Sequence, residues 1–375
     1  MRPMAKKNSR NLNLKANLMN ILIFAGGSGT RLWPASRKKT PKQLLKFVGN
    51  DTLLQHTYKR VRKVAKPEQI FIATASGYAN QIRKQIPAIQ KSHYSLEPAR
   101  KNRGPALGLA VLIMSKQSND KIFATAWADD HITQTDLYKE TLQLSADYIK
   151  SNPKSLIAVG VKPTSAHSGF CYIQSGKSIA GNKNIFAVKK FTDKPTKAQA
   201  EKYFATDNYY WNTGYFISHA DHILALYKKY KPKAYDLLMK IKPHIGTSKQ
   251  AAMIDKYYAQ MPEFDFEDIL RAHPEQLLSV KANFDWADVG RWSTVKDIQS
   301  AKTANLIKGK VLDHETIGSL IYNYNDKQLL TTLHVKDLII VVTPESILVA
   351  DKRYSEELKH LIAKLQADPK LNKYL

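Results

Sequence analysis

The chain has 375 residues and a formal net charge of +26, from 58 lysine and arginine residues against 32 acidic ones, and its length suffices for one large domain or for a large and a small one. The single cysteine, Cys171, excludes internal disulfide bonds and cysteine-based zinc sites, and it suits a reducing compartment. Because no apolar stretch is long enough to span a membrane, we expect a cytoplasmic protein without a membrane partner.

The first segment, residues 1–18, is basic and polar and contains no acidic residue. A secretory signal would need an apolar core of about seven or more residues after the charges. Polar residues interrupt the stretch from Leu12 to Asn20 instead. We therefore predict that residues 1–18 form a disordered basic tail.

The first predicted strand, Ile21 to Ala25, runs directly into a glycine-rich loop that is followed by cations. Glycine adopts positive φ freely and lets backbone N–H groups approach an anion closely, while arginine and lysine supply charge that amides lack. A nucleoside triphosphate is therefore the predicted ligand. The residues concerned are Gly26, Gly27, Ser28, Gly29, Thr30, Arg31 and, after Pro41, Lys42.

Two better-known phosphate-binding loops do not fit this segment. The P-loop has lysine and then serine or threonine directly after its last glycine, and Thr30-Arg31 stands there instead. The dinucleotide fingerprint needs a further glycine where Leu32 stands. A tight turn between strand and helix, without a ligand, would explain the glycines but not the cations that follow them.

Up to about residue 160, short apolar runs alternate with helical patterns. This alternation predicts parallel βαβ units and a doubly wound sheet. Ligands of such sheets bind outside the carboxyl ends of the strands, where the loops Gly26–Arg31 and Asp129–His131 would both emerge. The predicted strands are Ile21–Ala25, Ile70–Ala75, Ile122–Ala126 and Leu156–Val161, and the predicted helices are Leu53–Val64 and Ala106–Lys116.

Beyond about residue 300 the pattern changes to short β-like runs separated by turn residues, and a helical segment, Tyr354 to Leu365, follows them. No glycine-rich or cationic loop lies among these runs. We therefore predict a small β-rich C-terminal domain over residues 301–375, closed by a helix. The predicted strands are Leu320–Tyr322, Leu329–Leu333, Leu338–Val342 and Ile347–Val349.

The stretch from Phe24 to Phe47, FAGGSGTRLWPASRKKTPKQLLKF, resembles the signature of the sugar-nucleotide pyrophosphorylases, and its WPxSR and PKQ elements resemble the mannose-1-phosphate guanylyltransferase branch. The resemblance implies the α/β nucleotide-diphospho-sugar transferase fold, a Rossmann-like doubly wound mixed sheet, over residues 19–300. It also implies a small C-terminal β-rich, β-helix-like domain that packs on the catalytic domain and helps to assemble homo-oligomers. Further matching motifs are Glu97-Pro98, Asn102, Pro105-Ala106, Asp130-His131, Lys162-Pro163-Thr164, Lys194-Pro195, Trp211–Gly214 and Trp286–Trp292.

The resemblance implies a reaction in which mannose 1-phosphate attacks the α-phosphate of GTP and gives GDP-mannose and pyrophosphate. Little covalent work falls to the protein in such a transfer, which depends on positioning and on neutralisation of charge. Arg31 and Lys42 are therefore the predicted catalytic residues. The predicted nucleotide-binding residues are Gly26, Gly27, Ser28, Gly29, Thr30, Glu97 and Asn102.

A divalent cation, Mg²⁺ above all, is the predicted cofactor, because it needs only one or two carboxylates besides phosphates and water. Asp130 follows the apolar strand that ends at Ala126, and Asp288 lies in the last matching motif. Asp129 could reach the metal as well as Asp130, and the resemblance selects Asp130. An aspartate pair at this place could also cap a helix or form a turn.

The resemblance assigns binding of the sugar phosphate to Gly169, Asp193, Lys194 and Asn212. Lysine holds a phosphate as a point charge, and an asparagine amide both donates and accepts hydrogen bonds to hydroxyls. Asp193 stands where relatives have glutamate, and the segment Ala166–Tyr172 lacks an acid and a glycine that relatives have. We expect Cys171, which replaces that glycine, to pack as a small hydrophobic residue in a strand.

Three other functions stay open at this point. The first is the same reaction with another sugar 1-phosphate or nucleotide. The second is a non-catalytic, nucleotide-sugar-binding regulatory subunit, but such a protein has no need to retain Arg31, Lys42 and Asp288. The third is nucleic-acid binding, which the charge alone would suit. The lysines are spread along the whole chain without a nucleic-acid-binding motif, so we expect no nucleic-acid partner.

Overall fold

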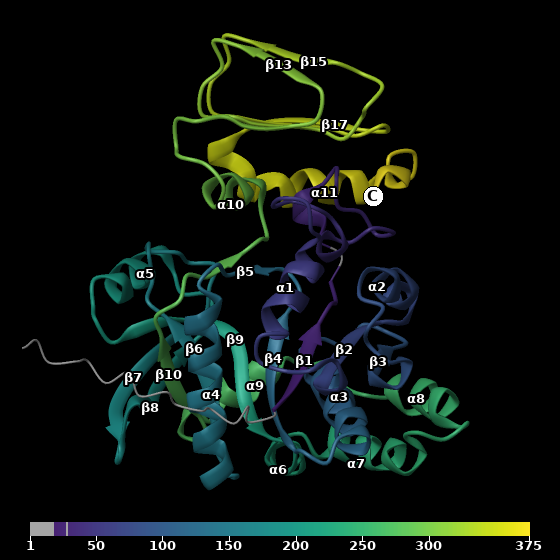
Figure 1. The fold of residues 1–375 in the computed structure, drawn as a ribbon, viewed down its shortest axis with the longest axis vertical. Helices are drawn as coiled ribbons and strands as arrows, with labels where there is room; N and C mark the ends of the chain where they lie inside the picture. Colours follow the sequence, from purple (N-terminus) through teal and green to yellow (C-terminus); the bar gives the residue numbers. More distant parts are fainter. Residues whose placement is uncertain (1–18, 28) are drawn as a thin grey trace, which may run out of the picture.

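The structure, a computed structural model, describes residues 19–27 and 29–375. The tail predicted over residues 1–18, and Ser28 of the glycine loop, lie outside the described residues. Figure 1 shows a large α/β unit, in which helices cover a central sheet, and a smaller β-rich unit at one end of it.

The central sheet has nine strands in the order β3-β2-β1-β4-β9-β6-β10-β8-β7. Strands β1 to β4 lie side by side and are parallel to one another, whereas β9 is antiparallel to both β4 and β6. The sheet is therefore mixed, as predicted. The strands are β1 Asn20–Phe24, β2 Ile70–Ala75, β3 Tyr94–Glu97, β4 Ile122–Trp127, β6 Leu156–Val161, β7 Tyr172–Ile179, β8 Asn182–Thr192, β9 Tyr209–His219 and β10 Leu278–Ala282.

Helices cover both faces of the sheet because its central strands are apolar on both sides. In β1, Leu22 and Phe24 pack toward α3 and α6 to α9, while Ile21 and Ile23 pack toward α1, α2, α4 and α5. The helices are α1 Leu53–Val61, α2 Ala79–Gln85, α3 Arg103–Gln117, α4 Thr135–Ser151, α5 Lys197–Phe204, α6 Ala220–Tyr230, α7 Pro232–Ile241, α8 Gln250–Tyr258, α9 Phe266–Ala272 and α10 Trp292–Asp297.

The chain goes from β1 to β2 and β3 on one side of β1, and β4 then lies on its other side. The order in which strands are added to the sheet therefore reverses between β1 and β4, and an α/β sheet binds its ligand at such a point. The loops after these two strands carry the glycines and Asp129–His131. A short two-stranded sheet lies beyond them, formed by β5 Asp130–His131 and β11 Ala287–Asp288.

The strands predicted before residue 160 are all present, with bounds within one residue of those expected. The helix predicted over Leu53–Val64 ends at Val61, and the one predicted from Ala106 begins at Arg103. Strands β3, β8, β9 and β10 were outside the prediction, whereas the strand expected at Cys171 is β7, which begins one residue later. In β8 only Ile185, Val188 and Phe191 are buried, so this strand lacks the continuous apolar run of a central strand.

The C-terminal unit stacks short strands in parallel, as expected of a β-helix-like domain: β12, β14 and β16 form one parallel ladder, and β13 and β15 form another. The expected closing helix is present but begins at Leu358, because Tyr354 has a non-helical backbone within the preceding 3₁₀ segment, η8 Lys352–Glu357. The elements are β12 Leu306–Lys308, β13 Val311–His314, β14 Leu320–Asn323, β15 Leu330–Leu333, β16 Leu338–Val342, β17 Ile347–Asp351 and α11 Leu358–Ala367.

The C-terminal unit packs on the segment that follows the glycine loop, with α11 between the strands and that segment (Figure 1). Leu32, Trp33 and Phe47 share one hydrophobic cluster with β14, β16 and α11. The Trp33 indole donates to the Tyr374 carbonyl oxygen at 2.8 Å, and the Trp292 indole donates to the Trp33 carbonyl oxygen at 2.9 Å. The C-terminal unit therefore buries the apolar side of the glycine-loop region.

Candidate active site at the carboxyl ends of β1 and β4

The glycine loop lies at the carboxyl end of β1 and contacts Lys42 closely. Gly27 and Gly29 have φ of 91° and 60°, which are values that L side chains rarely adopt. A Cβ on Gly29 would lie 2.7 Å from Lys42 Cγ and 2.9 Å from Ser36 Oγ. Glycine at position 29 therefore fixes where the buried Lys42 stem lies, as well as the backbone of the loop.

Lys42, in the 3₁₀ segment η2 Lys42–Leu44, places its ammonium group between two carboxylates. Its Nζ lies 2.5 Å from Asp129 Oδ2 and 3.3 Å from Asp288 Oδ1, and it donates to the Val289 carbonyl oxygen at 3.2 Å. Burial opposes the charge on Lys42, but the two aspartates outweigh burial and hold its pKa above the usual range. Burial likewise opposes the charge on Asp288, yet Lys42 and Arg31 keep the pKa of Asp288 low.

Asp130 is almost completely buried, and an indole binds its carboxylate. Its Oδ2 accepts a hydrogen bond from the Trp286 indole at 3.0 Å, and its carbonyl oxygen accepts one from the Arg60 guanidinium at 3.1 Å. It faces Asp288 across the β5–β11 pair. Burial, and then the charges of Asp129 and Asp288, raise the pKa of Asp130 well above the ordinary value of an aspartate.

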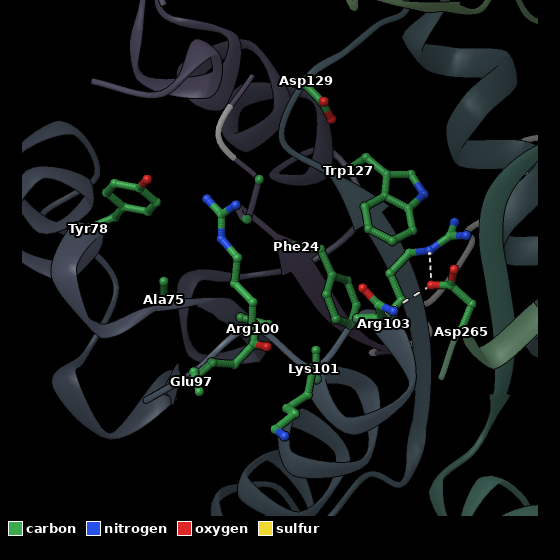
Figure 2. Close-up of a pocket in the computed structure, with 16 residues that line it drawn as sticks. Phe24, Ala75, Tyr78, Glu97, Arg100, Lys101, Arg103, Trp127, Asp129 and Asp265 are labelled. Carbon is green, nitrogen blue, oxygen red and sulfur yellow. Dashed lines mark hydrogen bonds and ion pairs between the residues drawn. The ribbon is translucent and has the colours of Figure 1, made fainter. Parts of the chain in front are cut away.

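A cavity of about 440 Å³ opens beside the glycine loop. In Figure 2, Glu97 and Asp129 lie at opposite ends of this cavity, and the Arg100 side chain extends into the middle of it. Because β2 and β3 follow β1 in order toward that edge of the sheet, the cavity runs from the glycine loop across the end of β2 to Glu97 at the end of β3. We name it the nucleotide cavity; its lining includes Gly26, Gly27, Ala75, Tyr78, Glu97, Arg100, Lys101 and Asn102.

A second cavity, of about 420 Å³, lies on the other side of β4, and we name it the sugar cavity. Arg103, Trp127, Asp129 and Asp265 line both cavities, so the two meet at the carboxyl end of β4. Figure 2 shows the ion pair between Arg103 and Asp265 at this boundary, with an N–O distance of 2.9 Å. The sugar cavity is further lined by Arg31, Asp130, Gly169, Asp193, Lys194, Asn212, Glu267 and Asp288.

Asp193 is held from two sides within the sugar cavity. Its Oδ1 accepts from the Cys171 thiol at 3.0 Å, and its Oδ2 accepts from the Arg271 guanidinium at 2.7 Å. Cys171 lies half-buried just before β7 and packs against the core as expected of a small hydrophobic residue, and its thiol is in addition a hydrogen-bond donor. Burial and the Asp193 carboxylate both raise the pKa of the Cys171 thiol, which therefore stays a hydrogen-bond donor.

Beside the sugar cavity, polar contacts connect the loop before β7 to the C-terminal unit. Arg291 forms an ion pair with Glu356 of η8, and its Nη2 lies 2.8 Å from His167 Nε2. His167 Nδ1 accepts from the backbone N–H of Gly169 at 3.0 Å. Gly169, which the sequence assigns to sugar binding, is therefore positioned through a chain of contacts that ends outside the α/β unit.

The predicted site residues come together at the two cavities, with Lys42 bound to two aspartates that line them. Besides Lys42, the predicted residues that line neither cavity, among those the structure describes, are Gly29, which packs against Lys42, and Thr30, which begins η1 Thr30–Leu32. Arg103, Trp127, Asp265 and Glu267 were outside the prediction. Arg103 directly follows Asn102, and Trp127 directly follows the predicted strand Ile122–Ala126, two positions before Asp129. Their position along the chain was therefore the signal that could have found them.

The carboxylates of Asp130 and Asp288 fit a magnesium ion whose other ligands are phosphate oxygens and water. Within residues 19–27 and 29–375, no group of three or more histidine, cysteine, aspartate or glutamate side chains is arranged to hold a metal ion by itself. Magnesium needs only one or two carboxylates, because water and phosphate oxygens complete its coordination. Burial and the like charges of Asp129 and Asp288 both disfavour the charge on Asp130, and a divalent ion would relieve that repulsion.

Known proteins resemble both parts of the chain. Residues 20–305 match the family model for nucleotidyl transferases, and residues 309–365 match the model for the beta-helix domain of mannose phosphate isomerase and GMP-like proteins. The chain is 31% identical over 356 residues to a mannose-1-phosphate guanylyltransferase of Escherichia coli K12, which covers 92% of this chain and 73% of that protein. It is 30% identical to a mannose-1-phosphate guanylyltransferase of Salmonella typhimurium over 94% of this chain and 73% of that protein.

Solved structures share the fold. A Thermus thermophilus structure described as mannose-1-phosphate geranyltransferase superposes with a TM-score of 0.81 at 24% identity, over 93% of this chain and 99% of that one. A Helicobacter pylori structure described as mannose-6-phosphate isomerase superposes with a TM-score of 0.57 at 18% identity, over 72% of this chain and 100% of that one.

None of the helices in the described part of the chain is long and apolar enough to cross a membrane.

Proposed function

The chain belongs to the nucleotidyl transferase family and groups with its mannose-1-phosphate guanylyltransferases, and we propose that it joins GTP and α-D-mannose 1-phosphate into GDP-mannose with release of pyrophosphate. One observation carries the proposal: the nucleotide cavity and the sugar cavity meet beside Lys42, Asp129 and Asp288. A nucleotide and a sugar phosphate held in these cavities would have their reacting phosphates at the shared boundary. Bringing two reactants together in this way supplies much of the acceleration of a phosphate-transfer reaction.

Glu97 supports guanine as the base. A triphosphate bound at the glycine loop would extend its nucleoside along the cavity toward Glu97, which lines the far end. An ionised carboxylate only accepts hydrogen bonds. The Watson–Crick edge of guanine presents two adjacent donors, N1–H and the N2 amino group, whereas adenine presents an acceptor at N1.

Arg31 and Lys42 would stabilise the charge that develops on the α-phosphate and on the leaving pyrophosphate. Arg31 lines the sugar cavity at the carboxyl end of β1, and Lys42 is held as a cation by Asp129 and Asp288. Lys42 stands in place before the substrates bind, so little reorganisation of this group would oppose the reaction. Asp130 and Asp288 would hold the magnesium ion, which when bound neutralises phosphate charge.

The sugar cavity offers groups suited to a hexose phosphate. Lys194 supplies a cation for the phosphate, and Asn212 and Asp193 supply donors and acceptors for hydroxyl groups. Asp193 is one methylene shorter than a glutamate, and Arg271 and Cys171 fix both of its oxygens. We propose that these contacts set where the shorter carboxylate meets the sugar. The single cysteine and the reaction class suit a cytoplasmic location.

The direct test measures pyrophosphate release with Mg²⁺ across GTP, ATP, UTP, CTP and dTTP, each combined with several sugar 1-phosphates, beside a Lys42→Ala control. We expect strong turnover with GTP and mannose 1-phosphate and a loss of about a hundredfold or more in the control. Strong turnover with another pair would keep the reaction and reassign the substrate. No turnover with any pair would contradict the proposal and favour a non-catalytic nucleotide-sugar-binding subunit.

A further inference from the structure

The hydroxyl group of Tyr258 contacts the carboxylate at the far end of the nucleotide cavity. Tyr258 is the last residue of α8, and its hydroxyl donates a hydrogen bond to Glu97 Oε2 at 2.7 Å. The Tyr258 ring is completely buried in the cluster that α3, α6, α7 and α9 share. A side chain packed this way has little freedom, so it fixes one oxygen of Glu97 in space.

We infer that Tyr258 is a positioning residue for recognition of the base: it orients the Glu97 carboxylate so that the remaining acceptor sites face the nucleotide. The inference rests on the proposed function, because it assumes that Glu97 meets guanine. A carboxylate has about four lone-pair sites, and Tyr258 uses one of them. Enough sites remain on Glu97 to accept both donors of a guanine edge.

Tyr258 also favours the ionised form of Glu97, which is the form that guanine requires. Burial raises the pKa of Glu97, while the Tyr258 hydrogen bond and the Arg100 guanidinium both lower it. Tyr258 from α8 and Arg100 from the loop after β3 are the groups that act on Glu97. Burial and the nearby Glu97 charge raise the pKa of Tyr258 above its usual range, so this hydroxyl stays protonated and keeps donating.

The test compares Tyr258→Phe with the wild-type enzyme, using initial rates with GTP and with ATP. Phenylalanine keeps the buried ring and removes the hydroxyl alone. A Glu97 carboxylate that is no longer oriented accepts the two guanine donors less well, so we expect the KM for GTP to rise about tenfold or more. We expect kcat at saturating GTP to change less than about twofold, because the reacting phosphates lie at the other end of the cavity.

The pH profile supplies a readout that a purely structural role would not change. Ionised Glu97 is lost as the pH falls through its pKa, and removal of the Tyr258 donor raises that pKa. The acid limb of kcat/KM for GTP should therefore move to higher pH in Tyr258→Phe. Glu97→Gln has no such titration, so adding Tyr258→Phe to it should cause little further change in kcat/KM.

Tyr227→Phe is the matched control. Tyr227 is buried in the same cluster, and its hydroxyl donates to the Gly104 carbonyl oxygen at 2.7 Å, so the variant loses an equally short hydrogen bond without touching Glu97. Equal effects of both variants on the GTP-to-ATP preference and on the acid limb would overturn the inference. A wild-type enzyme that shows no preference for GTP would instead contradict the proposed function.

Discussion

At the scale of single residues, the two adjacent aspartates after β4 have different surroundings. Asp129 lies 2.5 Å from the Lys42 ammonium, whereas Asp130 lies among Trp286, Arg60 and Tyr215. The charge of Asp129 is therefore compensated by Lys42, whereas burial and the charges of Asp129 and Asp288 oppose the charge of Asp130. Asp130 is the carboxylate that gains most from an added cation.

Asparagine substitutions distinguish the roles of the predicted metal ligands, Asp130 and Asp288, from the role of the neighbouring Asp129. In Asp130→Asn and Asp288→Asn, we expect the Mg²⁺ concentration for half-maximal rate to rise about tenfold or more, because each loses a charged ligand. Asp129→Asn is the matched control from the same loop. It should slow turnover through Lys42 and leave that Mg²⁺ concentration unchanged.

Titration of the initial rate with Mg²⁺ at saturating substrates measures this difference. The assignment of Asp130 would be wrong if Asp129→Asn moved the Mg²⁺ curve and Asp130→Asn did not. A circular dichroism spectrum of each variant shows whether a loss of rate reflects a loss of fold.

At the scale of elements, the glycine loop and η2 act as one unit. Gly29 has left-handed backbone geometry, and Lys42 packs directly against its Cα. The loop, which we propose to bind the triphosphate, therefore also sets the position of Lys42, the proposed catalytic cation. A residue with a side chain at position 29 would have to displace that cation.

A comparison of Gly29→Ala with Gly49→Ala separates the steric clash with Lys42 from the strain of the backbone. Both glycines have φ near 60°, so alanine at either should cost about 1–2 kcal/mol of stability. A Cβ at Gly49 meets nothing within 4 Å, whereas one at Gly29 meets Lys42. We expect kcat to fall about tenfold or more in Gly29→Ala alone, since small misplacements of a catalytic group are costly.

Steady-state kinetics with GTP and mannose 1-phosphate, together with thermal unfolding, measure both effects. Equal losses of kcat in the two variants would show that strain alone explains the result and that contact with Lys42 has no part in it.

At the scale of the whole molecule, the C-terminal unit and the active-site region share a hydrophobic cluster. Val289, which directly follows Asp288, and Leu32, which directly follows Arg31, pack in the same cluster as Ile339 and Val341 of β16. Arg37 adds an ion pair to Glu345 across the same boundary. We therefore expect the two units to unfold together in one cooperative transition.

Ile339→Ala tests this coupling, and Ile347→Ala on the neighbouring strand is its control. Ile339 is 1% exposed and Ile347 is 61% exposed, so the same substitution removes buried methyl groups in one case only. We expect Ile339→Ala to lower the free energy of unfolding by about 2–5 kcal/mol and Ile347→Ala to change it by about 0.5 kcal/mol or less.

Calorimetry and the loss of activity on heating should follow the same single transition in both variants. Two separate transitions in Ile339→Ala, with activity surviving the first, would show that the C-terminal unit folds and acts independently of the active site.

The sequence by itself determined the central strands and the place of the glycine loop after the first of them. Ile21–Ala25 and Leu156–Val161 are continuous apolar runs, as expected of strands that helices cover on both faces. Local signals of this kind suffice when a segment's own side chains decide its structure. The antiparallel pairing of β7 with β8 escaped detection although the two strands are consecutive, because β8 mixes lysine and asparagine with apolar residues and lacks the continuous apolar run of a central strand.

Only the tertiary structure decided how the site residues are paired. Lys42 and Asp288 are separated by 246 positions, and Glu97 and Tyr258 by 161, so no local pattern could join them. The thiol of Cys171 looked apolar in sequence and became a donor because folding brought Asp193 to it. The secondary structure of a segment follows from residues close to it in sequence. The charge state, orientation and partners of a side chain depend instead on the groups that folding brings around it.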